Sequence, residues 1–310
     1  MGECAIKTVN LTRDFKSVRA LDDLTMEVPA GTVFGFLGPN GSGKTTTIHL
    51  LLGLLEPTAG SAEVLGFDTR KQADSIRDAT GALLEFSGLY ERLTAMDNLE
   101  FYGRVWKMPA QDRKERAREL LDHIGLWDRR NEIVGKWSRG MKQKLAVTRA
   151  LFHRPRLLFL DEPTAGLDPV AATALRDDIA SLAKREHTTV FLTTHNLTEA
   201  EKLCGKVGVI NKGRLVAIGP PDELRYRAGK PRIEITGKGF SDELVAGLRA
   251  RPEVSAVDRL DGHLVIDLRG DGNASGLVSF IVSSGGEIEE VHKGTASLEE
   301  AFLSLVEEDQ

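Results

Sequence analysis

Residues suited to binding phosphate follow a short apolar segment near the N-terminus. Residues 32–37 have a strand pattern, and the residues after position 45 repeat their apolar side chains at helical spacing. Glycines between a strand and a helix let backbone N–H groups point at phosphate oxygens, and the helix N-terminus adds positive potential. A lysine adds a point charge, and a threonine hydroxyl can bind Mg²⁺. These features predict a phosphate loop, with a plain glycine-rich turn as the alternative, over Gly38, Pro39, Asn40, Gly41, Ser42, Gly43, Lys44 and Thr45.

Two adjacent carboxylates end a second apolar segment. Residues 157–160 are all apolar, and Asp161 and Glu162 follow directly. Acids at the tip of a buried strand are costly unless a metal ion or hydrogen bonds satisfy them. We therefore expect Asp161 to hold Mg²⁺ and Glu162 to orient or deprotonate an attacking water molecule. The alternative is that the pair only caps the turn at Pro163-Thr164.

The elements that must position these residues alternate between strands and helices. The apolar residues at 48, 51, 52 and 55 predict a helix that begins after the phosphate loop and ends before Pro57. Residues 93–125 are mostly helical, with an amphipathic stretch at 113–124. The first third contains further strand patterns at 5–9 and 25–28. Apolar or β-branched runs at 157–160, 189–193 and 206–210 indicate buried parallel strands, so the fold class is α/β.

A second, smaller domain is expected from residue 230 to residue 310. Its elements follow the order βαββαβ of the ferredoxin-like unit, an α+β fold. Ser241 is a candidate N-cap, and Asp261-Gly262 is a candidate hairpin turn. A last amphipathic helix is expected at 298–306. We interpret this domain as a regulatory or dimer-stabilising module, with a simple packing extension as the alternative.

Length, composition and charge exclude several classes of protein. Its 310 residues allow about two domains, and 41% hydrophobic residues exclude long disorder. A net charge of −5 argues against nucleic acid as a partner. The longest apolar run, residues 48–55, falls far short of the about 20 residues that span a bilayer. Because the start shows no signal-peptide pattern and Cys4 and Cys204 form no disulfide framework, we expect a cytoplasmic protein.

Together with these motifs, the segment before Asp161 resembles the ATP-binding-cassette (ABC) ATPases. Trp137-Ser138-Arg139-Gly140-Met141-Lys142-Gln143 stands where that family keeps its signature, Asp168 lies in a segment similar to its D-loop, and His195 matches its switch histidine. The resemblance covers about residues 5–225. It implies a P-loop NTPase domain at 1–229, with a RecA-like core, a β subdomain and a helical signature subdomain at about 86–150.

The resemblance also implies a role for each site residue. Two such domains close head to tail around two Mg-ATP, so that Ser138, Arg139, Gly140 and Met141 of one chain face the ATP bound by Lys44 of the other. Glu162, His195 and Lys44 would be catalytic, and Phe15 would stack on adenine. Taken singly, Ser138 could be a helix N-cap, His195 a strand-end histidine and Phe15 a core aromatic. The implied ATP-binding set is Phe15, Gly38, Pro39, Asn40, Gly41, Ser42, Gly43, Lys44, Thr45 and Thr46.

Two positions depart from the common pattern of the family. Arg139 stands where the signature usually has glycine, and it either adds positive charge near the phosphates or faces solvent. Glu85 stands where the family's Q-loop usually has glutamine. Since a carboxylate can also bind Mg²⁺, we expect Glu85, Thr45 and Asp161 to hold the metal ion. The alternative is that Glu85 is a solvated loop acid.

The function expected from the resemblance is ATP hydrolysis in a homodimer that drives transport. A separate integral membrane permease would dock against residues 85–104 and the helical insert, which places the protein on the cytoplasmic face of the membrane. The C-terminal extension and the sequence after Glu85 resemble bacterial exporters of drugs, natural products, polysaccharides, lipids or sodium. The alternatives are a soluble ABC ATPase without a transport role and an ATP-dependent scaffold that does not hydrolyse ATP.

Overall fold

The structure, a computed structural model, describes residues 4–228, 232–269, 274–294, 298–300 and 302. It divides into two compact units, Met1–Gly219 and Pro220–Gln310. The division precedes the domain boundary expected near Lys230, which lies outside the described residues. Helix α8 (Pro221–Ala228) therefore groups with the second unit.

A mixed sheet of six strands forms the centre of the first unit. Its order is β10-β9-β3-β8-β7-β6, and only β10 runs antiparallel to its neighbour. The central strands are buried along nearly their whole length, as the apolar runs predicted. The strands are β3 (Val33–Leu37), β6 (Thr80–Leu83), β7 (Leu157–Asp161), β8 (Thr189–Thr194), β9 (Lys206–Asn211) and β10 (Arg214–Gly219).

An antiparallel sheet of four strands covers one side of this core. It consists of β2 (Val18–Pro29), β1 (Cys4–Phe15), β4 (Ala59–Val64) and β5 (Phe67–Asp68) in that order. The first two strands are longer than the predicted segments at 5–9 and 25–28. Their pairing contains several register shifts, which interrupt the alternation of apolar and polar side chains from which strands are predicted.

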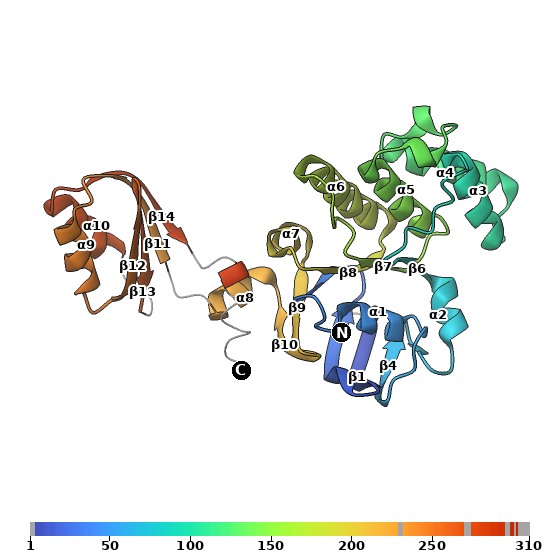
Figure 1. Ribbon diagram of the computed structural model, residues 1–310, viewed down its shortest axis with the longest axis horizontal. Helices are drawn as coiled ribbons and strands as arrows, with labels where there is room; N and C mark the ends of the chain where they lie inside the picture. Colours follow the sequence, from blue (N-terminus) through green and yellow to red (C-terminus); the bar gives the residue numbers. More distant parts are fainter. Residues whose placement is uncertain (1–3, 229–231, 270–273, 295–297, 301, 303–310) are drawn as a thin grey trace. The chain divides into compact units, whose positions relative to one another are not determined.

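Helices lie on both faces of the mixed sheet. In Figure 1, α5 (Arg139–Leu151) and α6 (Pro169–Glu186) lie on one side, and α1 (Lys44–Leu51) lies on the other with the antiparallel sheet. Helix α1 ends four residues earlier than the expected Leu55, because Gly53 adopts φ +64°. Leu55 still packs against the core, so the apolar pattern predicted its burial but not its conformation. Two short helices remain: α2 (Ala73–Ala79) contacts β5 and β6, and α7 (Leu197–Leu203) contacts β3, β8 and α6.

The expected helical insert contains α3 (Ala95–Val105), α4 (Ala110–His123) and α5, joined by the short 3₁₀ turns η1 (Trp127–Arg129) and η2 (Val134–Lys136). Thr94 begins α3 by accepting a hydrogen bond from the N–H of Asp97, and Ser138 begins α5 in the same way. Helix α5 contacts both β6 and α6, and it therefore joins the insert to the core.

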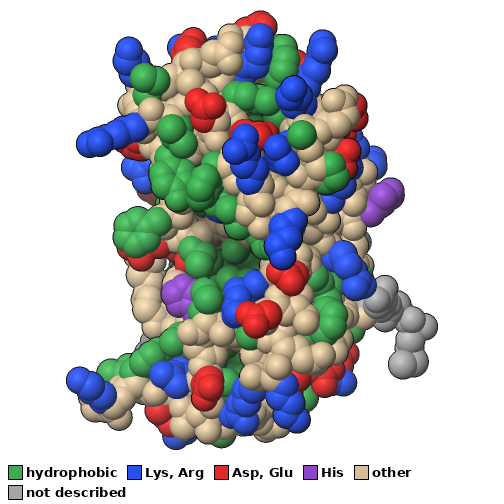
Figure 2. Space-filling view, turned by 90° about the vertical axis from the view of Figure 1, so that its right-hand side faces the viewer, with side chains coloured by type: hydrophobic (Ala, Val, Ile, Leu, Met, Phe, Trp, Pro, Cys, Tyr) green, Lys and Arg blue, Asp and Glu red, His purple; other side chains and the backbone are tan. Residues whose placement is uncertain are grey.

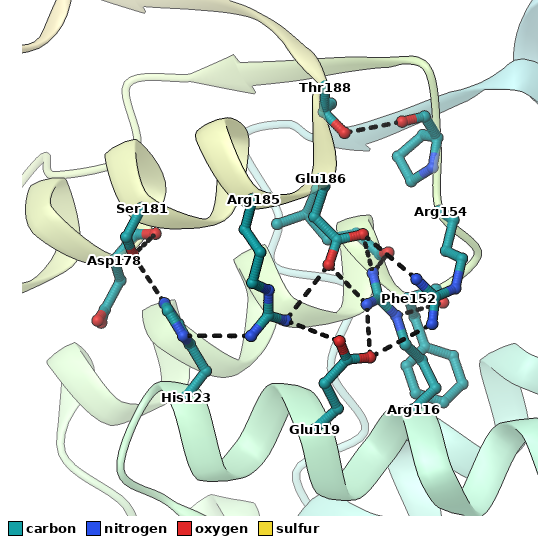
Figure 3. Close-up of polar contacts among 12 residues, drawn as sticks. Arg116, Glu119, His123, Phe152, Arg154, Asp178, Ser181, Arg185, Glu186 and Thr188 are labelled. Atoms are coloured by element: carbon teal, nitrogen blue, oxygen red, sulfur yellow. Dashed lines mark hydrogen bonds and ion pairs between the residues drawn. The ribbon is translucent and has the colours of Figure 1, made fainter.

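A buried arginine forms a second connection between the insert and the core (Figure 3). Arg116 of α4 is only 2% exposed and donates to both carboxylate oxygens of Glu186 at the end of α6, each at 2.7 Å. It also donates to the carbonyls of Leu151 and Phe152. Burial raises the pKa of Glu186, but the hydrogen bonds and charge of Arg116 outweigh this effect and leave the pKa below its ordinary value. Three helices thus meet at one charged group.

The second unit contains the expected βαββαβ arrangement. Its sheet has the order β12-β13-β11-β14, all antiparallel, which is the ferredoxin-like order. Ser241 caps α9 as predicted. The predicted helix at 298–306 lies mostly outside the described residues. The elements are β11 (Arg232–Lys238), α9 (Asp242–Arg249), β12 (Val254–Leu260), β13 (His263–Leu268), α10 (Ala274–Ser283) and β14 (Glu287–Gly294).

Among the described residues, no helix combines the length and the apolar character that crossing a membrane requires.

Candidate functional site

The predicted phosphate loop connects β3 to α1 and packs closely against its neighbours. A Cβ atom at Gly38 would lie 2.4 Å from the carbonyl oxygen of Ile210, and one at Gly43 would lie 2.7 Å from that of Ala20. Gly43 also has φ +110°, a backbone conformation that side chains rarely adopt. The loop therefore requires glycine at these positions, and its backbone lies directly before the N-terminus of α1.

Lys44 lies at the centre of a group of polar contacts. Its side chain is 5% exposed, and Nζ donates to the carbonyls of Gly38 at 2.8 Å and Pro39 at 3.1 Å. The same nitrogen lies 3.3 Å from Oε1 of Glu162. The structure thus brings the lysine of the loop into direct contact with the second carboxylate that the sequence singled out.

Asp161 is held by two hydroxyl groups. Thr45 Oγ1 donates to Oδ2 at 2.8 Å, and Thr193 Oγ1 donates to Oδ1 at 2.5 Å. The oxygen of Thr193 also accepts a hydrogen bond from the N–H of Glu162 at 3.0 Å. Thr193 was missed in the sequence analysis. The parallel pairing of β7 with β8, which places it opposite Asp161, is the signal that could have found it.

Glu162 lies between two cationic or proton-donating groups. Its Oε1 contacts Lys44, and its Oε2 lies 2.9 Å from Nδ1 of His195, which is exposed. In the tautomer with its proton on Nδ1, His195 donates to this carboxylate. Glu162 itself has φ +47°, which turns its side chain out of the line of β7. The carboxylate therefore faces the loop and the histidine rather than the strand.

A cavity of about 400 Å³ adjoins these residues. Glu85 lies in its wall together with Thr45 and Asp161, and it is exposed. Gln143 of α5 also lines the cavity and donates to the carbonyl of Pro163 at 2.7 Å. The lining residues are Asn40, Thr45, Leu83, Leu84, Glu85, Ser87, Arg139, Gln143, Asp161, Glu162 and Ala165.

The signature residues separate into two groups. Arg139 lines the cavity and donates to the carbonyl of Ala165 at 2.9 Å, so it contacts the segment after the carboxylates instead of only facing solvent. Ser138, Gly140 and Met141 do not line this cavity. The hydroxyl of Ser138 accepts from the N–H of Met141, as an N-cap does.

Other predicted residues lie outside this group of contacts. Phe15 is 39% exposed at the end of β1, with the guanidinium of Arg13 4.5 Å from its ring centre. Asp168 is exposed and caps α6 by accepting from the N–H of Ala171. Within the loop, Ser42 is buried, Thr46 is half-buried, and Pro39, Asn40, Gly41 and Thr45 are exposed.

A strand, a glycine loop and a helix with Lys44-Thr45, in contact with two carboxylates at the end of β7, define a P-loop nucleotide-binding protein. The profile described as "ABC transporter" matches residues 21–165, and that of the "ATP-binding protein DrrA1-3-like, C-terminal domain" matches residues 219–306. The chain belongs to the ABC transporter ATP-binding proteins. It therefore binds ATP and hydrolyses it as the ATPase subunit of a transporter.

Relatives match over most or all of the chain. The bacitracin transport ATP-binding protein BcrA of Bacillus licheniformis is 42% identical over 73% of this chain and 72% of its own length. The daunorubicin resistance ATP-binding protein DrrA3 of Streptomyces coeruleorubidus is 36% identical over 100% of this chain and 98% of its own length. The similarity to DrrA3 therefore extends over the second unit of this chain.

Solved structures agree with this fold. The structure of an ATP-binding subunit of an ABC transporter covers 72% of this chain and 92% of that chain, with a TM-score of 0.64 and 29% identity. That of cbiO1 from Clostridium perfringens covers 81% of this chain and 96% of that chain, with a TM-score of 0.68 and 23% identity. The expected P-loop fold of ABC ATPase type, with its small C-terminal domain, is thus confirmed.

Proposed function

We propose that this ATPase works as a homodimer that closes around two Mg-ATP and drives export through a separate membrane permease. The observation that carries the catalytic part is the position of Glu162, whose two oxygens contact Lys44 and His195. A carboxylate held there can accept a proton from the water that attacks the γ-phosphate. Lys44 balances charge on the phosphates, and His195 hydrogen-bonds the γ-phosphate from the other side.

We assign Mg²⁺ to the edge of the cavity where three oxygen donors gather. The Thr45 hydroxyl and the Asp161 carboxylate are within hydrogen-bond distance of each other, and Glu85 lines the same cavity. Hard oxygen donors of this kind suit Mg²⁺, which usually keeps few protein ligands and completes its shell with phosphate and water. When bound, the ion neutralises charge that develops on the terminal phosphates.

Nucleotide binding in this proposal uses the loop residues Gly38 to Thr46 and the ring of Phe15. Partial exposure leaves that ring open to an adenine base. The position of the signature supports dimerisation. Ser138 is exposed at the start of α5 and does not line the cavity of its own chain, so we propose that it contacts the γ-phosphate in the other subunit, with Gly140 beside it.

An exposed apolar surface supports docking of a permease. Phe86 is 81% exposed, and Tyr90, Phe101 and Val105 are each more than 40% exposed. The rings of Tyr90 and Phe101 lie 4.9 Å apart, edge to face. Figure 2 shows hydrophobic side chains gathered on the face that carries α3, with basic side chains between them. We propose that a cytoplasmic helix of the permease binds here, which would hold the protein at the cytoplasmic face of the membrane.

The names of the relatives support an exporter. BcrA is named for bacitracin transport and DrrA3 for daunorubicin resistance. We therefore propose that this chain energises export of a drug or natural product. For the second unit we propose a regulatory or dimer-stabilising role, and the domain limits 1–229 and 230–310 stay a prediction.

The test compares wild-type protein with Glu162→Gln. Without the proton acceptor, phosphate release is expected to fall by about 100-fold or more, while Mg-ATP still binds and traps a dimer that size-exclusion mass measurement detects. Glu63→Gln on an exposed position of β4 is the matched control and should behave as wild type. Unchanged hydrolysis in Glu162→Gln would disprove the catalytic assignment. Absence of turnover in the wild type would instead favour a scaffold.

A further inference from the structure

Glu199 is a buried carboxylate next to the candidate catalytic residues, and no step proposed above uses it. It lies on α7, a short helix that follows β8, and it is 2% exposed. Burying a charged carboxylate is unfavourable unless hydrogen bonds or an opposite charge compensate. Its surroundings therefore indicate what it stabilises.

Two threonine hydroxyls donate to the same oxygen of Glu199. Thr164 Oγ1 lies 2.6 Å from Oε2, and Thr194 Oγ1 lies 3.2 Å from it. Thr164 belongs to the turn directly after Glu162, and Thr194 directly precedes His195. One carboxylate oxygen thus joins the segments that carry the two members of the Glu162–His195 contact.

The backbone around His195 is part of the same network. Thr194 Oγ1 accepts from the N–H of Asn196 at 2.9 Å, and the side chain of Asn196 accepts from the N–H of Glu199 at 3.2 Å. Asn196 thereby caps α7. Thr194 and Asn196, on either side of His195, thus belong to a closed ring of hydrogen bonds that begins and ends at Glu199.

The second oxygen of Glu199 lies toward a cavity. Oε1 has no hydrogen-bond partner among the described residues and lies 3.9 Å from Nε of Arg176. The cavity, of about 330 Å³, is lined by Glu199 and Arg176 as well as by Glu162 and His195. The fold therefore leaves open space on one side of the Glu162–His195 contact. The hydrogen bonds of Glu199 add to those between the N–H of Glu162 and Thr193 in holding the two segments together there.

We propose that Glu199 is a positioning residue. Through the hydroxyls of Thr164 and Thr194, it fixes the turn after Glu162 relative to the segment around His195. This inference rests on the catalytic roles proposed for Glu162 and His195. Glu199 acts through these residues and does not line the cavity that contains Thr45 and Asp161. Loss of the ring should lower kcat and leave the phosphate loop, and hence Mg-ATP binding, intact.

The test is a double-mutant cycle on the full-length chain. Thr164→Val removes the hydroxyl with little change in volume, and Glu199→Ala removes the carboxylate. Each is expected to lower kcat by about tenfold or more, since small misplacements of catalytic groups have effects of this size. The Kd for Mg-ATP should change less than about twofold, and Thr164→Ser should restore kcat. The double variant should be no slower than Glu199→Ala alone, because both changes break one interaction.

Lys202→Gln is the matched control, since it neutralises an exposed charge on the same helix. Thermal unfolding of each variant shows whether a lower kcat comes from loss of the fold or from displaced catalytic groups. If Glu199→Ala does not fold, Thr164→Val still tests the proposal. Wild-type kcat in Thr164→Val, additive effects in the double variant, or a parallel loss of Mg-ATP affinity would each overturn the proposal. Glu162→Gln measured alongside tests the catalytic role separately, because its full activity would refute that role whatever Glu199 does.

Discussion

Two acidic side chains assigned to Mg²⁺ differ in how the fold holds them. Asp161 accepts hydrogen bonds from Thr45 and Thr193, so its orientation is set before any ion binds. Glu85 is exposed and makes no hydrogen bond or ion pair within the described part of the chain. Its position in the cavity wall is therefore its one structural link to the site.

We expect Glu85→Ala to lower both ATP hydrolysis and transport by about tenfold or more, because an oxygen donor is lost at the edge of the metal site. Glu85→Gln keeps one oxygen donor and should retain most of the activity. Titration of hydrolysis with Mg²⁺ distinguishes a metal ligand from a solvated acid, since the alanine variant should need more Mg²⁺ for half-maximal rate. Glu63→Ala, at an exposed position of β4, is the control. Wild-type hydrolysis and transport in Glu85→Ala would contradict the assignment.

At the scale of elements, the helical insert depends on a buried charge for its connection to α6. Arg116 and Glu186 are 1% and 6% exposed at their side chains, so neither can be solvated if its partner is removed. Arg185 and His123 extend the seam between α4 and α6, where His123 lies 2.7 Å from the hydroxyl of Ser181 (Figure 3).

Glu186→Ala should destabilise the folded protein by about 3 kcal/mol, because the buried guanidinium of Arg116 loses its bidentate partner and keeps only the ion pair with Glu119. Combining it with Arg116→Met should recover part of this loss, since no uncompensated charge then remains. Denaturant unfolding of the single and double variants measures both effects. Arg118→Met, which breaks an exposed pair with Asp122 on the same helix, is the control and should change stability by less than about 1 kcal/mol. Equal losses in Glu186→Ala and Arg118→Met would show that the seam is not important for stability.

A second contact between elements predicts a dependence on pH. His153 follows α5, stacks on Trp106 after α3 at 3.9 Å, and contacts the carbonyl of Thr80 through Nε2. Burial lowers the pKa of His153 from 6.5 to about 4. Between these values the unfolded chain binds a proton that the folded chain does not, so the free energy of unfolding should fall as pH falls from about 6.5 to about 4.

His153→Phe keeps an aromatic ring against Trp106 and removes the titrating group. The pH dependence of unfolding in this window should therefore be weaker than in the wild type, as denaturant titrations at several pH values would show. His187→Asn, at an exposed position with φ +52°, removes an exposed histidine and should keep the wild-type profile. Identical slopes in wild type and His153→Phe would refute the assignment.

At the scale of the whole molecule, the proposed site draws on residues that one chain does not bring to the same cavity. The cavity beside Asp161 and Glu162 includes Arg139 of the signature, but Ser138 and Gly140 do not line it. A symmetric dimer could bring these groups to the ATP bound by the other subunit, so each site would contain residues of both chains.

Mixing two inactive variants tests this arrangement. Lys44→Ala disables the phosphate loop and leaves the signature of that chain intact. Ser138→Arg disables the signature and leaves the phosphate loop of that chain intact. Neither homodimer should hydrolyse ATP, whereas random mixing should restore about a quarter of the wild-type turnover, because half of the dimers then contain one intact site. Phosphate release from the mixture, compared with each variant alone, measures this. No recovery on mixing, although mixed dimers form, would exclude sites shared between chains.

The sequence by itself determined the features that depend on residues close together in the chain. The phosphate loop follows from glycines, Lys44 and Thr45 between a strand and a helix, and the carboxylates follow from two acids after an apolar run. The βαββαβ order of the second unit was predictable for the same reason, since period-2 and period-3.6 patterns are local. The ends of β1, β2 and α1 were not, because bulges and the conformation of Gly53 override these patterns.

Only the tertiary structure decided which distant residues meet. Thr193 reaches Asp161 because β7 and β8 pair in parallel, and Arg116 reaches Glu186 because α4 crosses the end of α6. The sequence does not single out Glu199, which is one acid of a polar helix. It becomes a candidate positioning residue because it is buried and accepts hydrogen bonds from Thr164 and Thr194. Contacts of this kind depend on strand register and helix packing, which residues close together in the chain do not specify.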